Sequence, residues 1–105
     1  MKTSELSGAA LDWAVTKAEG FDHEVTSSDW GMNGWATDWA QGGPIIQREK
    51  IQIKENGHGH WFAKKFIKDG WVRGATPLIA AMRCYVASKL GADVDVPNEL
   101  QGATA

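Results

Sequence analysis

The sequence of 105 residues contains a single cysteine, Cys84, and only three prolines. One cysteine cannot form a disulfide within the chain, so the fold must depend on packing and hydrogen bonds. The first residues also lack the charged-then-apolar pattern of a secretion signal. Because thiols stay reduced inside cells, these absences predict a cytoplasmic protein.

Long apolar runs and an excess of one charge are missing as well. The longest apolar run, residues 78–82, is much shorter than the roughly 20 residues that cross a bilayer. The 11 basic and 13 acidic residues give a net charge of −2, which provides no basic surface for nucleic acid. No basic amphipathic helix is present to lie on a membrane. The sequence therefore predicts neither a nucleic-acid partner nor a membrane partner.

Two segments have the pattern of amphipathic helices. The first covers residues 7–19, with Ser7 as the N-capping residue and Gly20 as the stop. The second covers residues 77–90 and begins after Thr76, another capping residue. The expected buried stripes are Leu6, Ala10, Leu11, Ala14, Val15 and Ala18 in the first, and Leu78, Ala81, Met82, Tyr85, Val86 and Leu90 in the second.

Between the helices the pattern indicates antiparallel strands. Residues 45–54 are predicted to form a strand, because apolar and polar side chains alternate at its end, and an Asn-Gly turn follows. A second strand over roughly residues 60–67 and a short third strand at 71–73 complete the sheet. The tail over residues 93–97 is expected to be extended and to lie at a sheet edge, because its proline cannot donate to a ladder.

These elements predict a small α+β two-layer domain, in which two helices pack on an antiparallel sheet of two to four strands. Residues 1–97 are expected to form this single domain, and residues 98–105 a flexible C-terminal tail. The content of 43% apolar and 23% charged residues is ordinary for a globular domain of this size.

The most distinctive segment follows the first helix. Residues 21–44 show no periodicity and contain several turn signals, yet they include Trp30, Trp35 and Trp39. Disordered segments are poor in aromatic residues, so we expect an ordered, irregular segment. Tryptophan rings stack on nucleobases, at about 1–3 kcal/mol per base, and glycines let the backbone approach a ligand closely. The alternative is that these tryptophans cover an open sheet face and the glycines only turn the chain.

The predicted ligand site joins this segment to the start of the second helix. Free N–H groups at a helix N-terminus favour an anion, so Thr76 offers a cradle for phosphate. Arg83 can hold a phosphate through two hydrogen bonds. The alternatives are a plain capped helix and an arginine with its charge in solvent. The predicted ligand-binding residues are Trp30, Trp35, Asp38, Trp39, Gln41, Gly42, Gly43, Thr76 and Arg83.

Catalysis and metal binding are not predicted. His58 and His60 can share a strand face as metal ligands do, but no second ligand pair is visible. Cys84 has no histidine nearby in the sequence and is expected to pack as a small apolar residue. Lys64 and Lys65 are expected to be solvated. No nucleophile elbow, Ser/His/Asp order or phosphate-loop pattern is present. We therefore expect no enzyme activity, no metal and no cofactor.

Three segments resemble the NinX-like proteins of lambdoid phages. They are residues 2–15 (KTSELSGAALDWAV), 38–46 (DWAQGGPII) and 76–86 (TPLIAAMRCYV), and they stand in the family's order. The resemblance covers most of residues 2–97 and implies a phage accessory protein made inside an infected bacterium. By analogy, small proteins of this kind blunt host functions, including immunity that is signalled by nucleotides.

Two functions are compatible with these features. The first is a homo-oligomeric binding protein that sequesters a small nucleotide-like ligand, which the phage context suggests is a host immune signalling molecule. The alternative is a protein–protein inhibitor or adaptor that acts on a host protein through exposed tryptophans. The Trp39–Gly43 end is the predicted centre of the site, with Trp30 and Trp35 tuning what it accepts.

Overall fold

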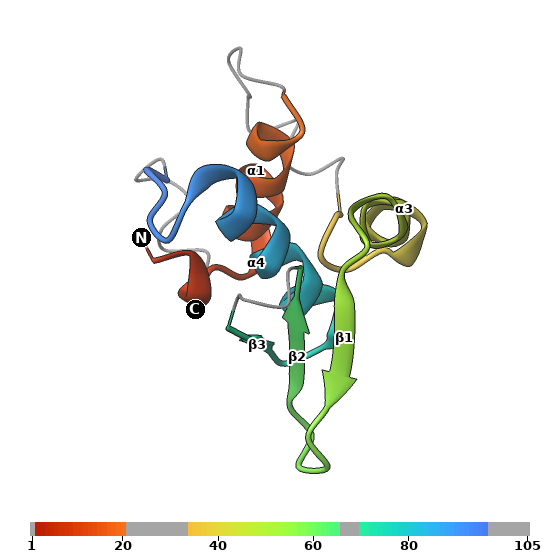
Figure 1. Ribbon diagram of the computed structural model, residues 1–105. Coiled ribbons are helices and arrows are strands. Elements are labelled where there is room, and N and C mark those ends of the chain that lie inside the picture. Colours follow the sequence, from red (N-terminus) through yellow and green to blue (C-terminus); the bar gives the residue numbers. More distant parts are fainter. Residues whose placement is uncertain (1, 21–33, 66–69, 97–105) are drawn as a thin grey trace.

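The computed structural model describes residues 2–20, 34–65 and 70–96. Figure 1 shows the arrangement of these elements, which form a small α+β fold as the sequence predicts. The elements are the 3-10 helix η1 (Thr3–Glu5), helices α1 (Gly8–Ala18) and α3 (Trp39–Glu49), strands β1 (Gln52–Glu55), β2 (Trp61–Lys64) and β3 (Val72–Gly74), and helix α4 (Pro77–Leu90). None of the helices in these ranges is long and apolar enough to cross a membrane.

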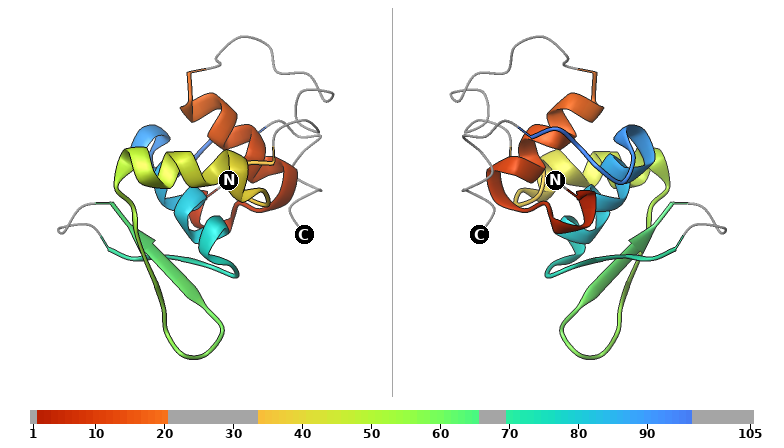
Figure 2. Two further views of the ribbon diagram at one scale, coloured as in Figure 1. Left: turned by 90° about the vertical axis from the view of Figure 1, so that its right-hand side faces the viewer. Right: turned by 90° about the vertical axis from the view of Figure 1, so that its left-hand side faces the viewer.

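Helix α4 is the centre of the fold. It packs on all three strands and also contacts α1, α3 and η1. Figure 2 shows α4 between the sheet and α1, so α1 is joined to the sheet mainly through α4. Because α4 is covered on several sides, its buried residues extend beyond the predicted stripe. They are Leu78, Ala80, Ala81, Met82, Cys84, Tyr85 and Val86.

The two helices predicted from sequence are confirmed. α1 begins after Ser7, and α4 begins after Thr76, whose hydroxyl accepts the N–H of Ile79 at 3.1 Å. Gly91 ends α4 with a φ of 93°, a conformation that favours glycine. The predicted stripe before and along α1 is fully buried at Leu6, Ala10, Leu11, Ala14 and Val15.

The prediction for residues 39–49 is wrong. The sequence indicates an irregular segment up to residue 44 and a strand from residue 45, but the structure has one continuous helix, α3. This helix begins after Asp38, whose carboxylate accepts the N–H of Ala40 at 2.9 Å. The first strand is therefore shorter than predicted and starts only at Gln52.

Packing explains why α3 forms despite its sequence. Gly42, Gly43 and Pro44 have the lowest helix propensities of all residue types, and they occupy consecutive positions in its first half. However, Gly42 and Ile45 lie one turn apart and are both buried. Helix α3 packs on α4, with Gly42 against Leu78. Contacts between helices therefore outweigh the local propensity.

The sheet has the order β1-β2-β3, and both neighbouring pairs are antiparallel. Ala63 in the central strand is fully buried, so the row of side chains to which it belongs faces α4. Side chains alternate between the two faces of a strand, so the adjoining row of Lys54, Phe62 and Arg73 faces away from α4. The predicted hairpin and third strand are confirmed, whereas residues 66–69 lie outside the described residues.

The segment after α4 does not lie at an edge of the sheet, contrary to the prediction. Asp93 forms an isolated antiparallel bridge with Lys2, beside the start of the chain. Val94 and Val96 are buried and belong to the core. Burial of these valines against the helices thus determines the path of the chain. The predicted tail, residues 98–105, lies outside the described residues.

Candidate functional site

Trp35 packs against the core, and its ring is held by a network of hydrogen bonds. Its indole N–H donates to the hydroxyl of Thr16 at 2.9 Å, and that hydroxyl donates to the carbonyl of Asp12 at 2.9 Å. The N–H of Ala36 donates to the Asp12 carboxylate at 3.0 Å. These bonds fix the turn before α3 on α1. Trp30 lies outside the described residues.

The Asp12 carboxyl should make stability depend on pH. Burial raises its pKa from 3.8 to about 6, although the hydrogen bond from Ala36 lowers it. Between these values the folded protein holds a proton that the unfolded chain has lost, so the free energy of unfolding should fall as pH rises from about 4 to about 6. Asp12→Asn keeps an oxygen acceptor for Ala36 and removes the charge.

We expect the Asp12→Asn variant to lack this fall in stability. Urea midpoints measured at about pH 4.5 and about pH 7 compare the two proteins at both ends of the window. If the variant kept the same difference between the two midpoints as the parent protein, the titration would belong to another group.

Asp38 to Gly43 form the start of α3. The Asp38 carboxylate caps the helix and accepts from the side chain of Gln41 at 3.3 Å. A carboxylate at this position already supplies the negative charge that a helix N-terminus favours, which argues against phosphate binding there. Gly42 is buried, whereas Trp39 is 54% exposed and its ring lies 3.8 Å from the place of a Cβ at Gly43. This end therefore presents one exposed aromatic ring.

Thr76 and Arg83 both have structural roles on α4. Thr76 caps the helix, and Arg83 donates from Nε to the carbonyl of Leu6 at 2.6 Å and from Nη1 to the carbonyl of Arg73 at 2.9 Å. Burial, together with the nearby Arg73 charge, lowers the pKa of Arg83. The guanidinium thus ties β3 and the chain before α1 to α4. A role for either residue in ligand binding stays a prediction.

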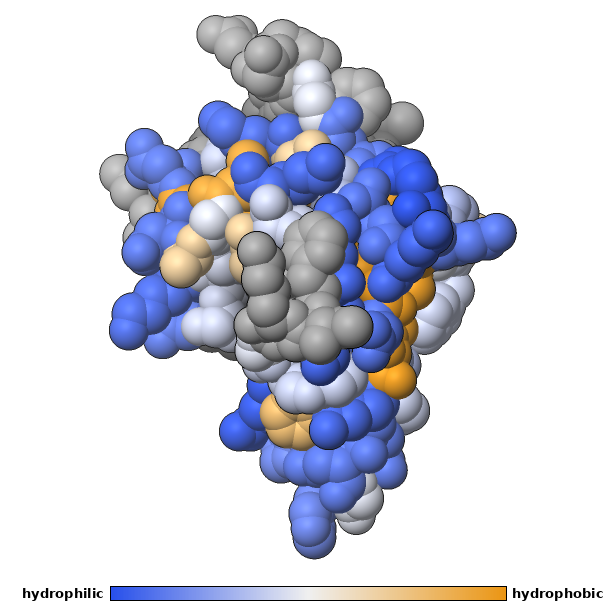
Figure 3. Space-filling model, in the orientation of Figure 1, coloured by the Kyte–Doolittle hydropathy of each residue, from blue (hydrophilic) through white to orange (hydrophobic). Residues whose placement is uncertain are grey.

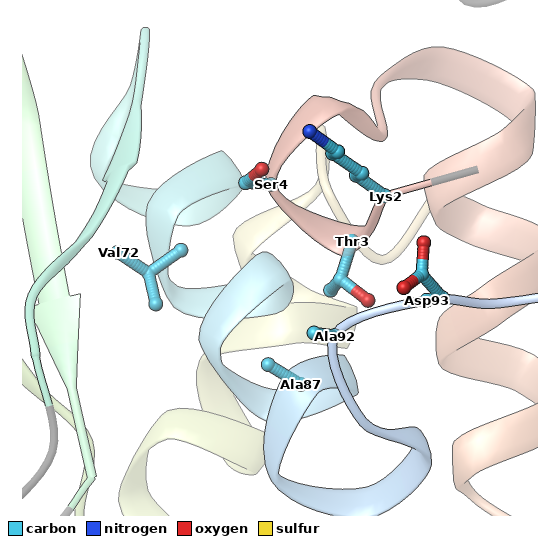
Figure 4. Close-up of a pocket in the computed structure, with 7 residues that line it drawn as sticks. All are labelled: Lys2, Thr3, Ser4, Val72, Ala87, Ala92 and Asp93. Carbon is cyan, nitrogen blue, oxygen red and sulfur yellow. The ribbon is translucent and has the colours of Figure 1, made fainter.

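A pocket of about 230 Å³ opens beside η1, away from the tryptophans of the predicted site. Figure 4 shows its lining side chains, which are Lys2, Thr3, Ser4, Val72, Ala87, Ala92 and Asp93. Its volume lies below the roughly 300–1,000 Å³ that small-molecule sites usually have, and its lining includes no aromatic ring. None of the predicted ligand-binding residues lines it.

Aromatic and basic side chains come together on the sheet surface that faces away from α4. We define the outer sheet face as Lys54, Phe62, Lys64, Trp71 and Arg73. Trp71 is 36% exposed, and the centroid of its ring lies 4.4 Å from Nζ of Lys54 and 4.6 Å from Nζ of Lys64. Ammonium groups at such distances are attracted to the electron-rich face of the ring. No described helix packs on this face.

The charge of the outer sheet face is positive, although the whole chain has a net charge of −2. It carries three cations, whereas Glu55 belongs to the opposite row with Trp61. Nη2 of Arg73 lies 3.1 Å from Nε2 of His60, which extends the polar surface towards the hairpin. Figure 3 shows that the part of the molecule around this hairpin is mostly hydrophilic, with a hydrophobic strip along its right-hand side. The face therefore combines an exposed ring with local positive charge.

The sequence predicts a solvated Lys64 and does not predict the outer sheet face. The Asn-Gly signal does not give this register, because a two-residue Asn-Gly loop would place Glu55 opposite His58. In the structure residues 56–60 form the loop, so that Lys54 lies opposite Phe62, and Lys64 lies two residues further along the same face. Alternation then assigns Trp71 and Arg73 to one face of β3 and its approach.

A second charged cluster joins α1, α3, α4 and the end of β2. Arg48 contacts Glu19 at 2.6 Å and Glu49 at 2.9 Å, Lys65 contacts Glu49 at 2.6 Å, and the Tyr85 hydroxyl bonds to Glu19. Hydrogen bonds from Lys65 and Arg48 lower the pKa of Glu49 to about 2. Burial and the bond to Glu19 raise the pKa of Tyr85, which keeps its hydroxyl protonated. The two acidic and two basic side chains of this cluster pair with each other, so they leave no net charge there.

The described residues include no group of three His, Cys, Asp or Glu side chains that could hold a metal ion. His58 and His60 lie in the loop between β1 and β2, where their N–H groups bond to the side chain of Asn56. Cys84 is buried on α4, as predicted for a packed residue. The expected absence of a cofactor and of enzyme activity stays a prediction.

The family comparison agrees with the resemblance seen in the sequence. The family model described as Bacteriophage P22, NinX matches residues 2–89, a range that runs from η1 almost to the end of α4. A search of the curated proteins gave no match. Because the family model covers far more than half of the residues, the chain belongs to the NinX family of bacteriophage P22.

Proposed function

We propose that this phage accessory protein binds and sequesters a small nucleotide-like ligand on the outer sheet face. The observation that carries the proposal is the exposed ring of Trp71 with the ammonium groups of Lys54 and Lys64 at 4.4 and 4.6 Å. A nucleotide needs both an aromatic surface for its base and cations for its phosphate. This face supplies the two within reach of each other.

On the Trp71 ring, stacking of a base is more favourable than the contact with a lysine that it would replace. A cation–π contact at an exposed site is worth about 0.5–1 kcal/mol, whereas stacking of a base on an aromatic side chain is worth about 1–3 kcal/mol. A base can therefore displace one lysine from Trp71, and the released ammonium is then free to pair with a phosphate. Arg73, exposed on the same face, adds a planar group suited to two bonds with phosphate.

The family context suggests where the ligand comes from. An accessory protein of a phage works in the infected cell, so we propose that it acts in the host cytoplasm on a nucleotide-like immune signal of the bacterium. Sequestration requires binding alone, and the proposal assigns no catalytic group. A homo-oligomer, which the sequence predicts, would raise the number of ligands held by each particle.

Replacing Trp71 with alanine should weaken ligand binding roughly 10- to 100-fold, because the stacking surface is lost. The measurement is isothermal titration calorimetry against a panel of mononucleotides, dinucleotides and ADP-ribose derivatives. Trp39→Ala is the matched control, because it removes an exposed tryptophan from α3 instead of the sheet.

The control also separates two locations of the site. A loss of affinity in Trp39→Ala but not in Trp71→Ala would move the site to the Trp39–Gly43 end that the sequence predicts. If no ligand of the panel binds the parent protein, the proposed sequestration is wrong.

A second function is favoured by one observation, the 54% exposure of Trp39 on α3. Exposed tryptophans are often the residues that dominate a protein–protein interface. The chain would then inhibit or adapt a host protein through this ring. Capture of a host protein by the parent chain, lost in Trp39→Ala and retained in Trp71→Ala, would support this alternative.

A further inference from the structure

We infer that the ligand of the outer sheet face carries two bases joined by a phosphodiester link. This inference rests on the proposed function and specifies the ligand of the same site. The observation behind it is that the face contains two aromatic rings with flanking cations. The first is Trp71 with Lys54 and Lys64. The second is Phe62, the outward aromatic residue of the central strand.

Phe62 has a cation on each side because of the sheet register. It is the direct partner of Lys54 on β1 and of Arg73 on β3. Directly opposite residues have Cβ atoms about 4.5–5.5 Å apart, so both long side chains begin beside the Phe62 ring. The ring is only partly buried, and it lies on the face opposite to the fully buried Ala63.

The two aromatic residues occupy different places on the outer sheet face. The pairing of β2 with β3 ends at Ala63 and Val72, and Trp71 directly precedes Val72. Alternation therefore places Trp71 on the same face as Phe62, but further from the hairpin. Successive bases of one ligand can stack on separate aromatic side chains.

Lys54 is a neighbour of both Trp71 and Phe62, and this position suggests where the linking phosphate would lie. Its ammonium lies 4.4 Å from the centroid of Trp71, and its backbone pairs with Phe62. A phosphodiester between the two bases would lie near this shared ammonium. Arg73 and Lys64 would remain for further phosphates on either side. The rows of strand residues that face away from α4 contain one further residue, Gln52, which is uncharged. No carboxylate in these rows would therefore repel an anionic ligand.

The test compares ligands with one and two bases. The parent protein is titrated with adenosine monophosphate, a linear adenine dinucleotide with one phosphodiester, its cyclic counterpart and a single-stranded adenine octanucleotide. Tryptophan fluorescence and calorimetry report binding. We expect each ligand with two bases to bind at least about tenfold more tightly than the mononucleotide, because the second ring adds a stacking contact.

Phe62→Leu is the matched variant, since it keeps an apolar side chain in the strand and removes the aromatic surface. It should weaken dinucleotide binding about five- to tenfold, a larger factor than for mononucleotide binding, which relies on Trp71. Circular dichroism and the urea midpoint verify that the variant is folded. Lys54→Gln, which alters the shared cation, should lower dinucleotide affinity more than mononucleotide affinity.

The outcomes separate this inference from the proposed function. Equal affinities for one and two bases, with no effect of Phe62→Leu, would overturn the two-base ligand but leave nucleotide binding intact. Absence of binding by every ligand would overturn both. A preference for the linear or cyclic dinucleotide supports the inference and identifies a free dinucleotide. Tighter binding of the octanucleotide than of either dinucleotide would overturn the inference, because a single strand of nucleic acid is not the small ligand of the proposed function.

Discussion

Replacing Gly42 with alanine is expected to lower the free energy of unfolding by about 3 kcal/mol, the upper part of the usual range for overpacking. A Cβ at this position would lie 2.3 Å from the carbonyl oxygen of Trp35 and 2.6 Å from Cδ1 of Leu78. The leucine can turn away, but the carbonyl belongs to the turn that Asp12 and Thr16 hold on α1. Helix α3 must therefore shift away from its neighbours.

Gly43→Ala is the control for this prediction, one residue further along the same helix. Its Cβ would meet only a ring carbon of Trp39, at 3.8 Å, which is an ordinary contact. Alanine is favoured over glycine within a helix by roughly 0.5–1 kcal/mol, so this variant should be more stable than the parent. Urea denaturation of both variants measures the difference. Equal changes in the two would contradict the close packing of α3 that the structure shows.

The helices α1 and α4 could be predicted because their signals are local. Each has a capping residue before it, a glycine after it and an apolar stripe along it, and the structure buries most of that stripe. Helix α3 has a capping residue, Asp38, but no glycine follows it and Gly42, Gly43 and Pro44 lie within it. The fit of Gly42 against Trp35 and Leu78 decides its conformation, and Leu78 is far from Gly42 in the sequence. Propensity alone indicated breakers at that place.

The candidate site was harder to predict than the fold, since it depends on which residues share a face. Net charge gave no sign of a basic surface, because acidic residues elsewhere outweigh the cations of the outer sheet face. The tryptophans near residues 30–39 led to the prediction that Trp35 binds a ligand. In the structure its ring packs against the core, and its N–H is bonded to Thr16. Trp71 stood alone in the sequence, and only the strand register brings Lys54 and Lys64 to it.

Arg83→Met is expected to lower the free energy of unfolding by about 1–3 kcal/mol. The methionine fills the space of the arginine stem, but the carbonyls of Leu6 and Arg73 lose the donors that they have at 2.6 and 2.9 Å. The Leu6 bond is part-buried, and an acceptor left there without its partner carries this cost, whereas the Arg73 carbonyl is exposed and can bond to water. The measurement is the urea midpoint together with the slope of the unfolding transition.

Arg83→Lys separates this structural role from the phosphate contact that the sequence predicts. Lysine keeps the positive charge but lacks the planar fork, so it can reach at most one of the two carbonyls in this geometry. We therefore expect a stability between those of the parent and Arg83→Met, and unchanged affinity for ligands of the outer sheet face. If instead both variants were as stable as the parent and lost ligand binding, Arg83 would belong to the binding site. Two hydrogen bonds to backbone carbonyls on separate segments favour the structural role, because they leave the guanidinium little freedom to turn towards a phosphate.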